Sequence, residues 1–408
     1  MKKILTLLLS FCLCIPIAEA QELGDSIVTD TLPWGHRFKN RVDSVLMNPL
    51  LQSSQLGLMV YDLTADTVVY TYGHRQTLRP ASTMKLLTAI TGIEMLGADY
   101  QLKTSLYYAG TIKDGTLYGN VYCVGTMDPL FDRSDMTSFV NKLRHLGIDT
   151  IRGRIHADVS FRDDDRLGEG WCWDDDNPVL TPLLYERKDN FVEQLTNGLQ
   201  RNGVVLVDTL ISPPASTVRK TRQEQQRIFV CSRSHGLNEL LVPMMKESDN
   251  LYAEALFFQI AASTGTRPAK AKLAANQVKR MIQKVGLRPG DYKIADGSGL
   301  SLYNYVSAEL EVRLLRYAWR TKQVYDLLLP SLPIAGVDGT LKSRMSDSAA
   351  AGNVHAKTGT LTGISSLAGY CTASNGHRLA FCIINQGIMR MADGRNLQDA
   401  LCRAMCEE

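Results

Sequence analysis

The pattern of apolar and polar positions divides the first hundred residues into four elements. After polar residues 21–31, helical periodicity predicts a helix over 37–47. Two runs of β-branched and aromatic residues, 56–63 and 67–72, are separated by a three-residue turn and predict paired strands. Residues 83–96 then form a strongly helical stretch that begins soon after a proline. The chain therefore opens as helix, strand pair and helix.

From about residue 100 the pattern changes to short strands separated by polar segments. The expected strands are 103–109, 116–124, 151–159, 204–209 and 228–232, with helices at 134–146 and 189–201. Residues 212–216 contain two prolines and two serines, and they precede a charged run, so a loop is expected there. Because this block is bounded on both sides by helical segments, we interpret 100–235 as an inserted domain.

The rest of the chain returns to longer helices and then ends in strands. We expect helices at 237–262 and 268–285, strands at 363–372 and 378–385, and an amphipathic helix at 395–406. Strands near both ends of the chain predict one antiparallel sheet built from both termini. The main domain would then comprise 21–99 and 236–408, and the fold class is α+β.

The first twenty residues have the composition of a targeting segment. Lys2 and Lys3 precede an apolar run, and Ala18 and Ala20 have the spacing of a cleavage site. This pattern predicts a cleaved secretory signal peptide over 1–20, too short for a membrane span. Lipidation at a leader cysteine is disfavoured because bulky residues precede both of them. We therefore expect a periplasmic or extracytoplasmic protein with no stable membrane anchor.

Composition and charge exclude several classes of protein. The chain has 408 residues, of which 45% are hydrophobic and 21% charged, so it is an ordinary globular protein. A net charge of +3 spread along the sequence argues against nucleic-acid binding. The histidines and cysteines lack metal-ligand spacing, so no metal site is expected. Beyond residue 20 the cysteines are odd in number, which leaves the disulfide pattern open.

Three short motifs stand in order along the chain. They are Ser-Thr-Met-Lys at 82–85, Ser-Asp-Asn at 248–250 and Lys-Thr-Gly at 357–359, followed by Thr360. Each is weak by itself, because a lone serine or lysine motif occurs by chance in a chain of this length. All three together, in this order and after an export signal, indicate a serine-nucleophile site.

The three-residue spacing between Ser82 and Lys85 in the first motif has a physical explanation. Residues three apart share a helix face, so the Lys85 amine can reach the Ser82 hydroxyl. The N–H groups at a helix start are free, so the Ser82 N–H can face a developing oxyanion. Lysine acts as a base only when neutral, and lowering its pKa from about 10.4 to about 7 corresponds to roughly 4.6 kcal/mol. Burial and a second cation, for which Lys357 is the candidate, could supply that.

The third motif is expected on a strand. Gly359 lacks a side chain, so an extended ligand could lie against the strand edge and pair with it. The Thr360 N–H would complete an oxyanion hole with that of Ser82. Lys357 and the hydroxyls of Thr358 and Thr360 would hold a carboxylate. Alone, this segment is only a charged residue at the start of a strand.

With these motifs the sequence resembles the penicillin-binding proteins and serine β-lactamases. The flanking sequence narrows this to the class C low-molecular-mass penicillin-binding proteins, the D-alanyl-D-alanine carboxypeptidase/endopeptidase group. The matching segments are 79–86, 170–175, 246–254, 296–301, 332–341 and 355–361. The resemblance implies a β-lactamase/transpeptidase-like antiparallel sheet flanked by helices, with a smaller mixed α/β insertion domain.

The resemblance also implies a role for each motif residue. Ser82 would be the acylated nucleophile with Lys85 as its base, and Ser248 would relay the proton to the leaving D-alanine. Asn250 would hold the substrate amide. Substrate binding would fall to Lys357, Thr358, Gly359 and Thr360. The implied partners are peptidoglycan stem peptides and β-lactam antibiotics, with no metal or organic cofactor.

The chain departs from the family pattern near the substrate side chain. Where the family usually has Arg after Gly-Leu-Ser, this sequence has Leu302. That Arg, with an Asp matching Asp175, is associated with the zwitterionic end of a diaminopimelate-type side chain. Asp175 could still bind an ammonium group, whereas position 302 could not pair with a carboxylate. The insertion is also shorter than in the larger members.

Two alternative functions are weighed against a serine D-Ala-D-Ala carboxypeptidase/endopeptidase. A serine β-lactamase needs fast deacylation, and no acidic residue in these motifs indicates a deacylating base. A non-catalytic penicillin-sensing or peptidoglycan-binding protein would not need Lys85. The sequence therefore favours a hydrolase that forms an acyl-enzyme on Ser82 and is acylated by penicillins.

Overall fold

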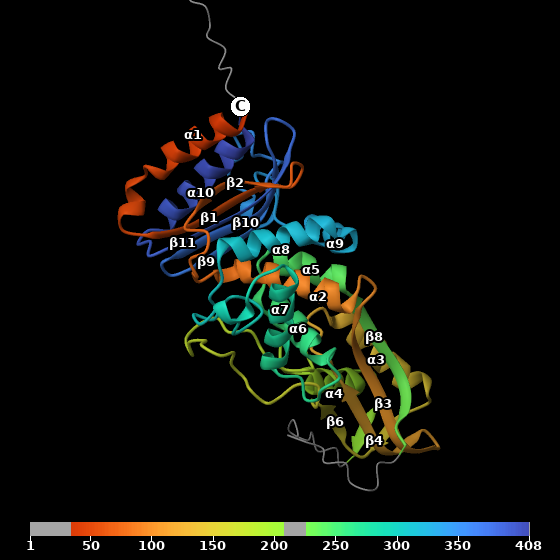
Figure 1. Ribbon diagram of the computed structural model, residues 1–408. Coiled ribbons are helices and arrows are strands. Elements are labelled where there is room, and N and C mark those ends of the chain that lie inside the picture. Colours follow the sequence, from red (N-terminus) through yellow and green to blue (C-terminus); the bar gives the residue numbers. More distant parts are fainter. Residues whose placement is uncertain (1–33, 208–225, 408) are drawn as a thin grey trace, which may run out of the picture. The chain divides into compact units, whose positions relative to one another are not determined.

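The computed structural model describes residues 34–207 and 226–407 (Figure 1). The predicted signal peptide and the loop at 212–216 lie outside the described residues, as does the end of the strand expected at 204–209. In the part described, no helix is long and apolar enough to cross a membrane.

The main sheet has five antiparallel strands in the order β2-β1-β11-β10-β9. The strands are β1 (Gln55–Asp62), β2 (Thr67–Tyr72), β9 (His355–Leu361), β10 (Ile364–Thr372) and β11 (Arg378–Gln386). Strands from the two ends of the chain meet where β1 pairs with β11, with Gln55 opposite Gln386. This confirms the prediction of one antiparallel sheet built from both termini.

Helices cover both faces of this sheet, because side chains on a strand alternate between its faces. Leu58 and Val60 pack into a core with α1 (Trp34–Leu46) and α10 (Met391–Cys406). Met59 and Tyr61 pack into the other core, which includes the helices around the nucleophile motif. Those helices are α2 (Met84–Leu96), α5 (Leu237–Lys246), α6 (Asn250–Ala262), α7 (Ala271–Lys284), α8 (Ala308–Arg320) and α9 (Lys322–Ser331). Figure 1 shows the two sets of helices on opposite sides of the strands.

The single helix expected over 237–262 is wrong, because the structure breaks it into α5 and α6 at residues 247–249. Ser248 has a φ of +61°, which an α-helix cannot accommodate. Asp249 then caps α6 by accepting a hydrogen bond from the N–H of Leu251 at 2.9 Å. The break places the Ser-Asp-Asn motif at a helix start, where the side chains of Ser248 and Asn250 contact the lysines of the site.

The second sheet takes all its strands from between Gln101 and Gly236. Its path is β7-β5-β4-β3-β8, with β6 paired to β4. The strands are β3 (Gln101–Lys113), β4 (Thr116–Val124), β5 (Thr150–Arg152), β6 (Ile155–Asp158), β7 (Val205–Val207) and β8 (Ile228–Gly236). The strand expected at 151–159 is thus two strands, since Gly153, with a φ of +157°, packs against the Gly119 carbonyl and interrupts it.

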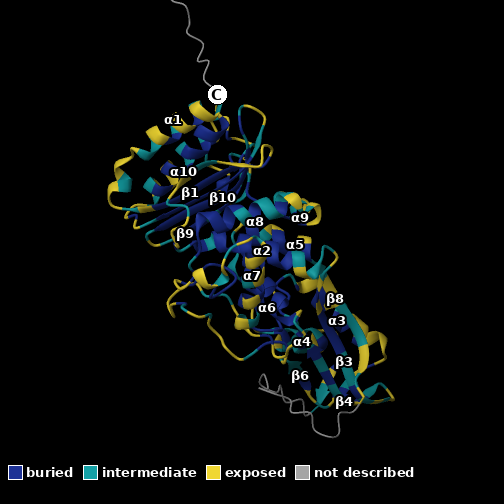
Figure 2. Ribbon diagram, viewed as in Figure 1, coloured by how far each residue is buried: buried dark blue, intermediate teal, exposed yellow. Residues whose placement is uncertain are grey.

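This second sheet has its own hydrophobic core (Figure 2). Helices α3 (Arg133–His145) and α4 (Phe191–Arg201) pack on it, and the rings of Phe131, Phe139 and Phe191 meet between them. Both helices match their predicted ranges within two residues. Four 3₁₀ turns complete the described elements: Pro49–Gln52, Ala81–Thr83, Pro289–Asp291 and Gly339–Leu341.

Candidate active site

Ser82 lies on the short 3₁₀ turn Ala81–Thr83 that leads directly into α2. Ala81 has a φ of +50°, so the turn carries local backbone strain at the residue before Ser82. Lys85 lies on the first turn of α2, and its Nζ donates to Ser82 Oγ at 2.9 Å. The spacing of three residues therefore produces the serine–lysine contact that the sequence predicts.

The amine of Lys85 is fully buried, and its three donors all have acceptors. Besides Ser82, it donates to Asn250 Oδ1 at 2.8 Å and to the Ser298 carbonyl at 2.8 Å. Burial lowers the pKa of Lys85 to about 8, while the negative charges of Asp296, Glu254 and Asp249 oppose that shift. A neutral lysine is thus accessible close to neutral pH.

The second lysine, Lys357, belongs to β9 and is also fully buried. Its Nζ donates to Ser248 Oγ at 2.8 Å and to the carbonyl of Thr358 at 2.6 Å. Burial lowers the pKa of Lys357 well below its usual value, and the positive charge of Lys85 lowers it further. The structure therefore brings the serines and lysines of all three motifs into one site, each serine bonded to a different lysine.

Gly359 is required for a reason that differs from the sequence argument. A Cβ at this position would lie 2.1 Å from Ser366 Oγ, 2.6 Å from the Pro80 carbonyl and 3.0 Å from the Ser82 nitrogen. The protein itself occupies that space, so the missing side chain lets β9 approach the turn that carries Ser82. The close approach sets the strand edge beside the nucleophile.

The outer side of β9 is paired at its start, where His355 bridges to Ile334, and beyond this bridge it has no strand partner among the described residues. β9 is the edge strand of the main sheet, so alternate backbone groups point away from β10. Thr360 is exposed on this strand, and Thr358 Oγ1 donates to Thr340 Oγ1 at 2.8 Å. Both threonines therefore lie on the edge strand of the main sheet, and their role in binding a carboxylate stays a prediction.

Three buried residues near Lys85, namely Glu254, Asp296 and Ser298, were not assigned roles from the sequence. Asp296 accepts hydrogen bonds from Trp171 Nε1 at 2.8 Å and Asn304 Nδ2 at 2.7 Å, besides two backbone N–H groups. Glu254 accepts from the N–H of Ser298 at 2.8 Å. These bonds fix the loop so that the Ser298 carbonyl points at Lys85. The only signal in the sequence was that these residues lie in segments matching the family.

The carboxyl group of Glu254 is unusual in its protonation. Burial raises the pKa of Glu254 to about 8, and the negative charge of Asp296 raises it further, against its hydrogen bonds to Ser298 and the charge of Lys85. Glu254 is therefore largely neutral at pH 7. The charge of each group shifts the pKa of the other, so the titrations of Glu254 and Lys85 are linked.

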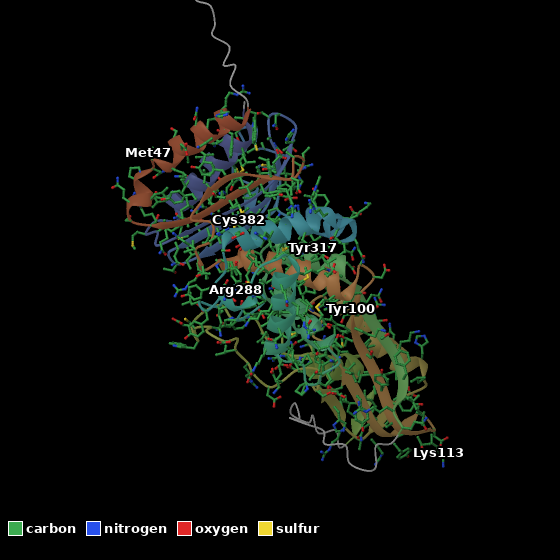
Figure 3. The ribbon with its side chains drawn as sticks, in the orientation of Figure 1. Met47, Tyr100, Lys113, Arg288, Tyr317 and Cys382 are labelled. Atoms are coloured by element: carbon green, nitrogen blue, oxygen red, sulfur yellow. The ribbon has the colours of Figure 1, made fainter. Side chains whose placement is uncertain are left out.

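The buried carboxyl group of Glu311 also contacts the turn that carries Ser82. Thr83 Oγ1 donates to Glu311 Oε1 at 2.7 Å, and Cys382 Sγ donates to Glu311 Oε2 at 3.3 Å. Cys382, labelled in Figure 3, lies on β11 in the main sheet. Burial raises the pKa of Glu311 to about 7. The turn is thereby tied to both α8 and the sheet.

Asp175, the last of the proposed site residues, makes a local hydrogen bond. It is exposed, and its Oδ2 accepts a hydrogen bond from the Cys172 N–H at 3.1 Å. The Leu302 carbonyl accepts from Arg79 Nε at 2.9 Å. The role of Asp175 therefore stays a prediction.

The described residues contain free thiols but no cluster of metal-binding side chains. Within residues 34–207 and 226–407, no group of three or more His, Cys, Asp or Glu side chains could hold a metal ion. The seven cysteines in those ranges are all free thiols.

Comparison with known proteins adds independent findings. The profile of the D-Ala-D-Ala carboxypeptidase 3 (S13) family matches residues 38–184 and 181–407. D-alanyl-D-alanine carboxypeptidase DacB of Haemophilus influenzae is 28% identical, covering 84% of this chain and 88% of the relative. Carboxypeptidase DacB of Mycolicibacterium smegmatis is 30% identical, covering 86% and 81%.

Solved structures share the fold. The crystal structure of penicillin binding protein 4 (dacB) from Haemophilus influenzae superposes with a TM-score of 0.78 at 24% identity, covering 88% of this chain and 97% of that one. The same protein complexed with a β-lactam gives a TM-score of 0.72 at 25% identity, covering 88% and 98%.

Proposed function

The chain belongs to the D-Ala-D-Ala carboxypeptidase 3 (S13) family, and on this premise we propose that it is a serine D-alanyl-D-alanine carboxypeptidase/endopeptidase of peptidoglycan stem peptides. The observation that carries the proposal is the buried Lys85 amine, hydrogen-bonded to Ser82 Oγ and to Asn250 Oδ1. Membership of this family confirms the resemblance drawn from the motifs. β-Lactam antibiotics, which present a similar acyl group, would acylate the same serine.

In the proposed acylation, neutral Lys85 takes the proton of Ser82 as Oγ attacks the carbonyl carbon of the penultimate D-alanine. The N–H groups of Ser82 and Thr360 would stabilise the oxyanion. The C–N bond then breaks, and Ser248 passes a proton to the leaving amine of the terminal D-alanine. The hydrogen bonds of Lys85 to Ser82 and of Lys357 to Ser248 support this division of roles. Water hydrolyses the ester in the second half-reaction.

Substrate binding is proposed along the open edge of β9. The exposure of Thr360 and the position of β9 at the sheet edge support a substrate that pairs with this strand. Thr358, Thr360 and Lys357 would receive the terminal carboxylate, and Asn250 the substrate amide. When the leaving amine belongs to a cross-linked diamino acid, the same chemistry makes the enzyme an endopeptidase, and Asp175 would bind a free side-chain ammonium group.

The proposed organisation is an exported enzyme with an inserted domain. Residues 1–20 would be removed as a signal peptide, leaving the protein in the periplasm or another extracytoplasmic space. The catalytic domain would comprise 21–99 and 236–408, with 100–235 inserted. The separate strands and hydrophobic core between Gln101 and Gly236 support this division.

Fluorescent penicillin tests the proposal against its alternatives. We expect covalent labelling of the purified enzyme and slow loss of the label, together with release of D-alanine from a pentapeptide substrate. Rapid loss of the label without D-alanine release would instead indicate a β-lactamase. A folded protein that takes up no label and releases no D-alanine would be a binding protein.

A further inference from the structure

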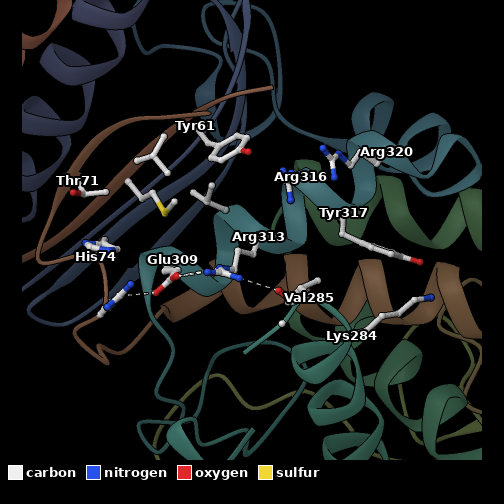
Figure 4. A pocket seen from close by; sticks show the side chains of 15 residues that line it. Tyr61, Thr71, His74, Lys284, Val285, Glu309, Arg313, Arg316, Tyr317 and Arg320 are labelled. Carbon is white, nitrogen blue, oxygen red and sulfur yellow. Dashed lines mark hydrogen bonds and ion pairs between the residues drawn. The ribbon is translucent and has the colours of Figure 1, made fainter. Parts of the chain in front are cut away.

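A cavity separate from the site of Ser82 lies at the edge of the main sheet farthest from β9. It is called the second cavity below. It has a volume of about 770 Å³ and is lined by β1, β2, the end of α7 and one face of α8 (Figure 4). β2 and β9 are the two edge strands, so four strand spacings of about 4.8 Å separate them. The cavity is therefore distinct from the site of Ser82, and its size falls in the range of ligand-binding pockets.

The lining of this cavity is strongly cationic. Five cationic side chains reach it: Arg75, Lys284, Arg313, Arg316 and Arg320. The last three share one face of α8 because they are spaced by three and four residues, and they extend over about 10 Å of helix. The arrangement is thus a row of guanidinium groups along a groove.

Carboxylates balance only part of this charge. Asp66 accepts from both Arg316, at 2.8 Å, and Arg320, at 2.6 Å. Glu309 likewise accepts from both Arg313, at 2.7 Å, and Arg75, at 3.2 Å. Lys284 pairs with Glu94. Among residues 34–207 and 226–407, three carboxylates therefore pair with these five cations, which leaves two positive charges unbalanced.

Two of the five cations, Arg316 and Lys284, lie over aromatic rings, and the groove has an apolar floor. The Arg316 guanidinium lies over the Tyr61 ring at 5.1 Å, and Lys284 Nζ lies over the Tyr317 ring at 4.8 Å. The buried side chain of Met59 contributes to the floor. Figure 4 shows the labelled arginines of α8 facing the strand that carries Tyr61.

We propose that this groove binds phosphate groups, as monoesters or diesters, at its two ends: at Arg75, which pairs with Glu309 near the start of α8, and at Arg320, which ends α8. Arg75 donates to Glu309 only through Nε and Arg320 to Asp66 only through Nη2, so each guanidinium has further N–H groups for a ligand. A carboxylate already accepts a hydrogen bond from one edge of each guanidinium group. A tetrahedral phosphate, with several oxygens and up to two negative charges, matches both the remaining donors and the unbalanced charge.

The phosphate could come from a soluble ester or from a lipid headgroup, and two probes separate these sources. Inorganic pyrophosphate binding is measured by calorimetry, and binding to phosphatidylglycerol vesicles by co-sedimentation, with phosphatidylcholine vesicles as the neutral reference. The test protein is the double variant Arg75→Gln/Arg320→Gln. The control is Arg288→Gln/Arg390→Gln, which removes the same charge from two arginines that are 87% and 82% exposed outside the cavity.

We expect wild type and control to bind at least one probe about tenfold or more tightly than the test variant, with binding weakened by salt. Binding of pyrophosphate alone would indicate a soluble ester, and binding of vesicles alone a lipid headgroup. Absence of binding to both probes, or equal affinities of the two double variants, would overturn the proposal. Release of D-alanine and thermal unfolding verify that each variant is folded; the single variant Arg320→Gln replaces the double variant if the latter unfolds.

Discussion

Lys85 and Lys357 are both fully buried, yet each donates its hydrogen bond to a serine rather than to a carboxylate: Lys85 to Ser82 and Lys357 to Ser248. Among the ion pairs of the described residues, neither lysine has a partner. Burying an unpaired ammonium group is costly, so the site favours neutral lysine. Burying these lysines lowers the stability of the folded protein. The same burial lowers the pKa of the lysine, which makes it usable as a base near neutral pH.

Replacing Ser82 by alanine should abolish covalent labelling by penicillin while preserving the fold. The hydroxyl accepts a hydrogen bond from Lys85, and its loss should change stability by only about 0.5–1.5 kcal/mol. The measurement combines fluorescent penicillin labelling with thermal unfolding. Ser134→Ala, which changes an exposed serine on α3, is the control and should label as wild type does. Labelling retained by the Ser82 variant would show that another residue is acylated.

Replacing Lys357 by methionine should move the acidic limb of the acylation pH profile upward. Acylation needs neutral Lys85, so the rate falls as the pH drops through a pKa of about 8. The charge of Lys85 lowers the pKa of Lys357, and a protonated Lys357 would in turn repel the proton of Lys85. Without that charge Lys85 should hold its proton more tightly. The limb is measured as the rate of penicillin acylation against pH.

The exposed Lys272→Met variant removes the same charge at a distance and should leave the limb unchanged. If the limb of the Lys357 variant also stays in place, then Lys357 is neutral in this pH range. Burial alone would then set the pKa of Lys85.

Replacing Glu254 by glutamine should shift the same limb in the opposite direction. The ionised carboxylate raises the pKa of Lys85, and glutamine keeps an oxygen that can accept from the Ser298 N–H without that charge. Lys85 should therefore lose its proton at lower pH. The effect should appear around pH 8, where Glu254 ionises. Glu193→Gln, at an exposed position on α4, is the control; an upward shift in the Glu254 variant would contradict the linkage.

An alanine at Gly359 should impair acylation more than folding. Its Cβ would meet Ser366 Oγ and the Pro80 carbonyl, which pushes β9 away from the turn of Ser82. Because displacement of reacting groups by about 1 Å can lower rates by about 10²-fold, we expect at least about a tenfold loss in acylation rate. Gly290→Ala places a Cβ in open space and should have no effect. A normal rate in the Gly359 variant would mean that the strand can retreat without moving the nucleophile.

The parts of the site that the sequence predicted are those governed by local geometry. The contact of Lys85 with Ser82 follows from helical spacing alone. The contact of Lys357 with Ser248 joins positions 109 residues apart, so only the resemblance to a family could suggest it. The roles of Glu254 and Asp296 were missed because burial and neighbouring charges, which one sequence does not display, determine them.

The fold was predictable to a similar extent, in the elements that local sequence patterns determine. Strands rich in β-branched and aromatic residues, such as β2 and β4, match their predicted ranges, whereas the break between α5 and α6 was missed. A positive φ at Ser248 leaves no pattern in the sequence around it. Helices α8 and α9 had no prediction, although α8 carries a clear apolar stripe of buried residues with charged residues such as Arg316 and Arg320 on its other face.

The role of Asp175 can be tested with peptides that end in D-Ala-D-Ala and differ only in a side-chain amine, free or acetylated. An exposed ion pair contributes at most about 1 kcal/mol, so wild type should prefer the free amine by up to about fivefold in acylation efficiency. Asp175→Asn should abolish that preference, because the amide keeps the shape but not the charge. Asp174→Asn and Asp176→Asn change neighbouring exposed carboxylates and should retain it. If wild type treats both peptides alike, or if the neighbouring variants lose the preference equally, the acidic loop acts only through its general field and Asp175 contributes no specific contact.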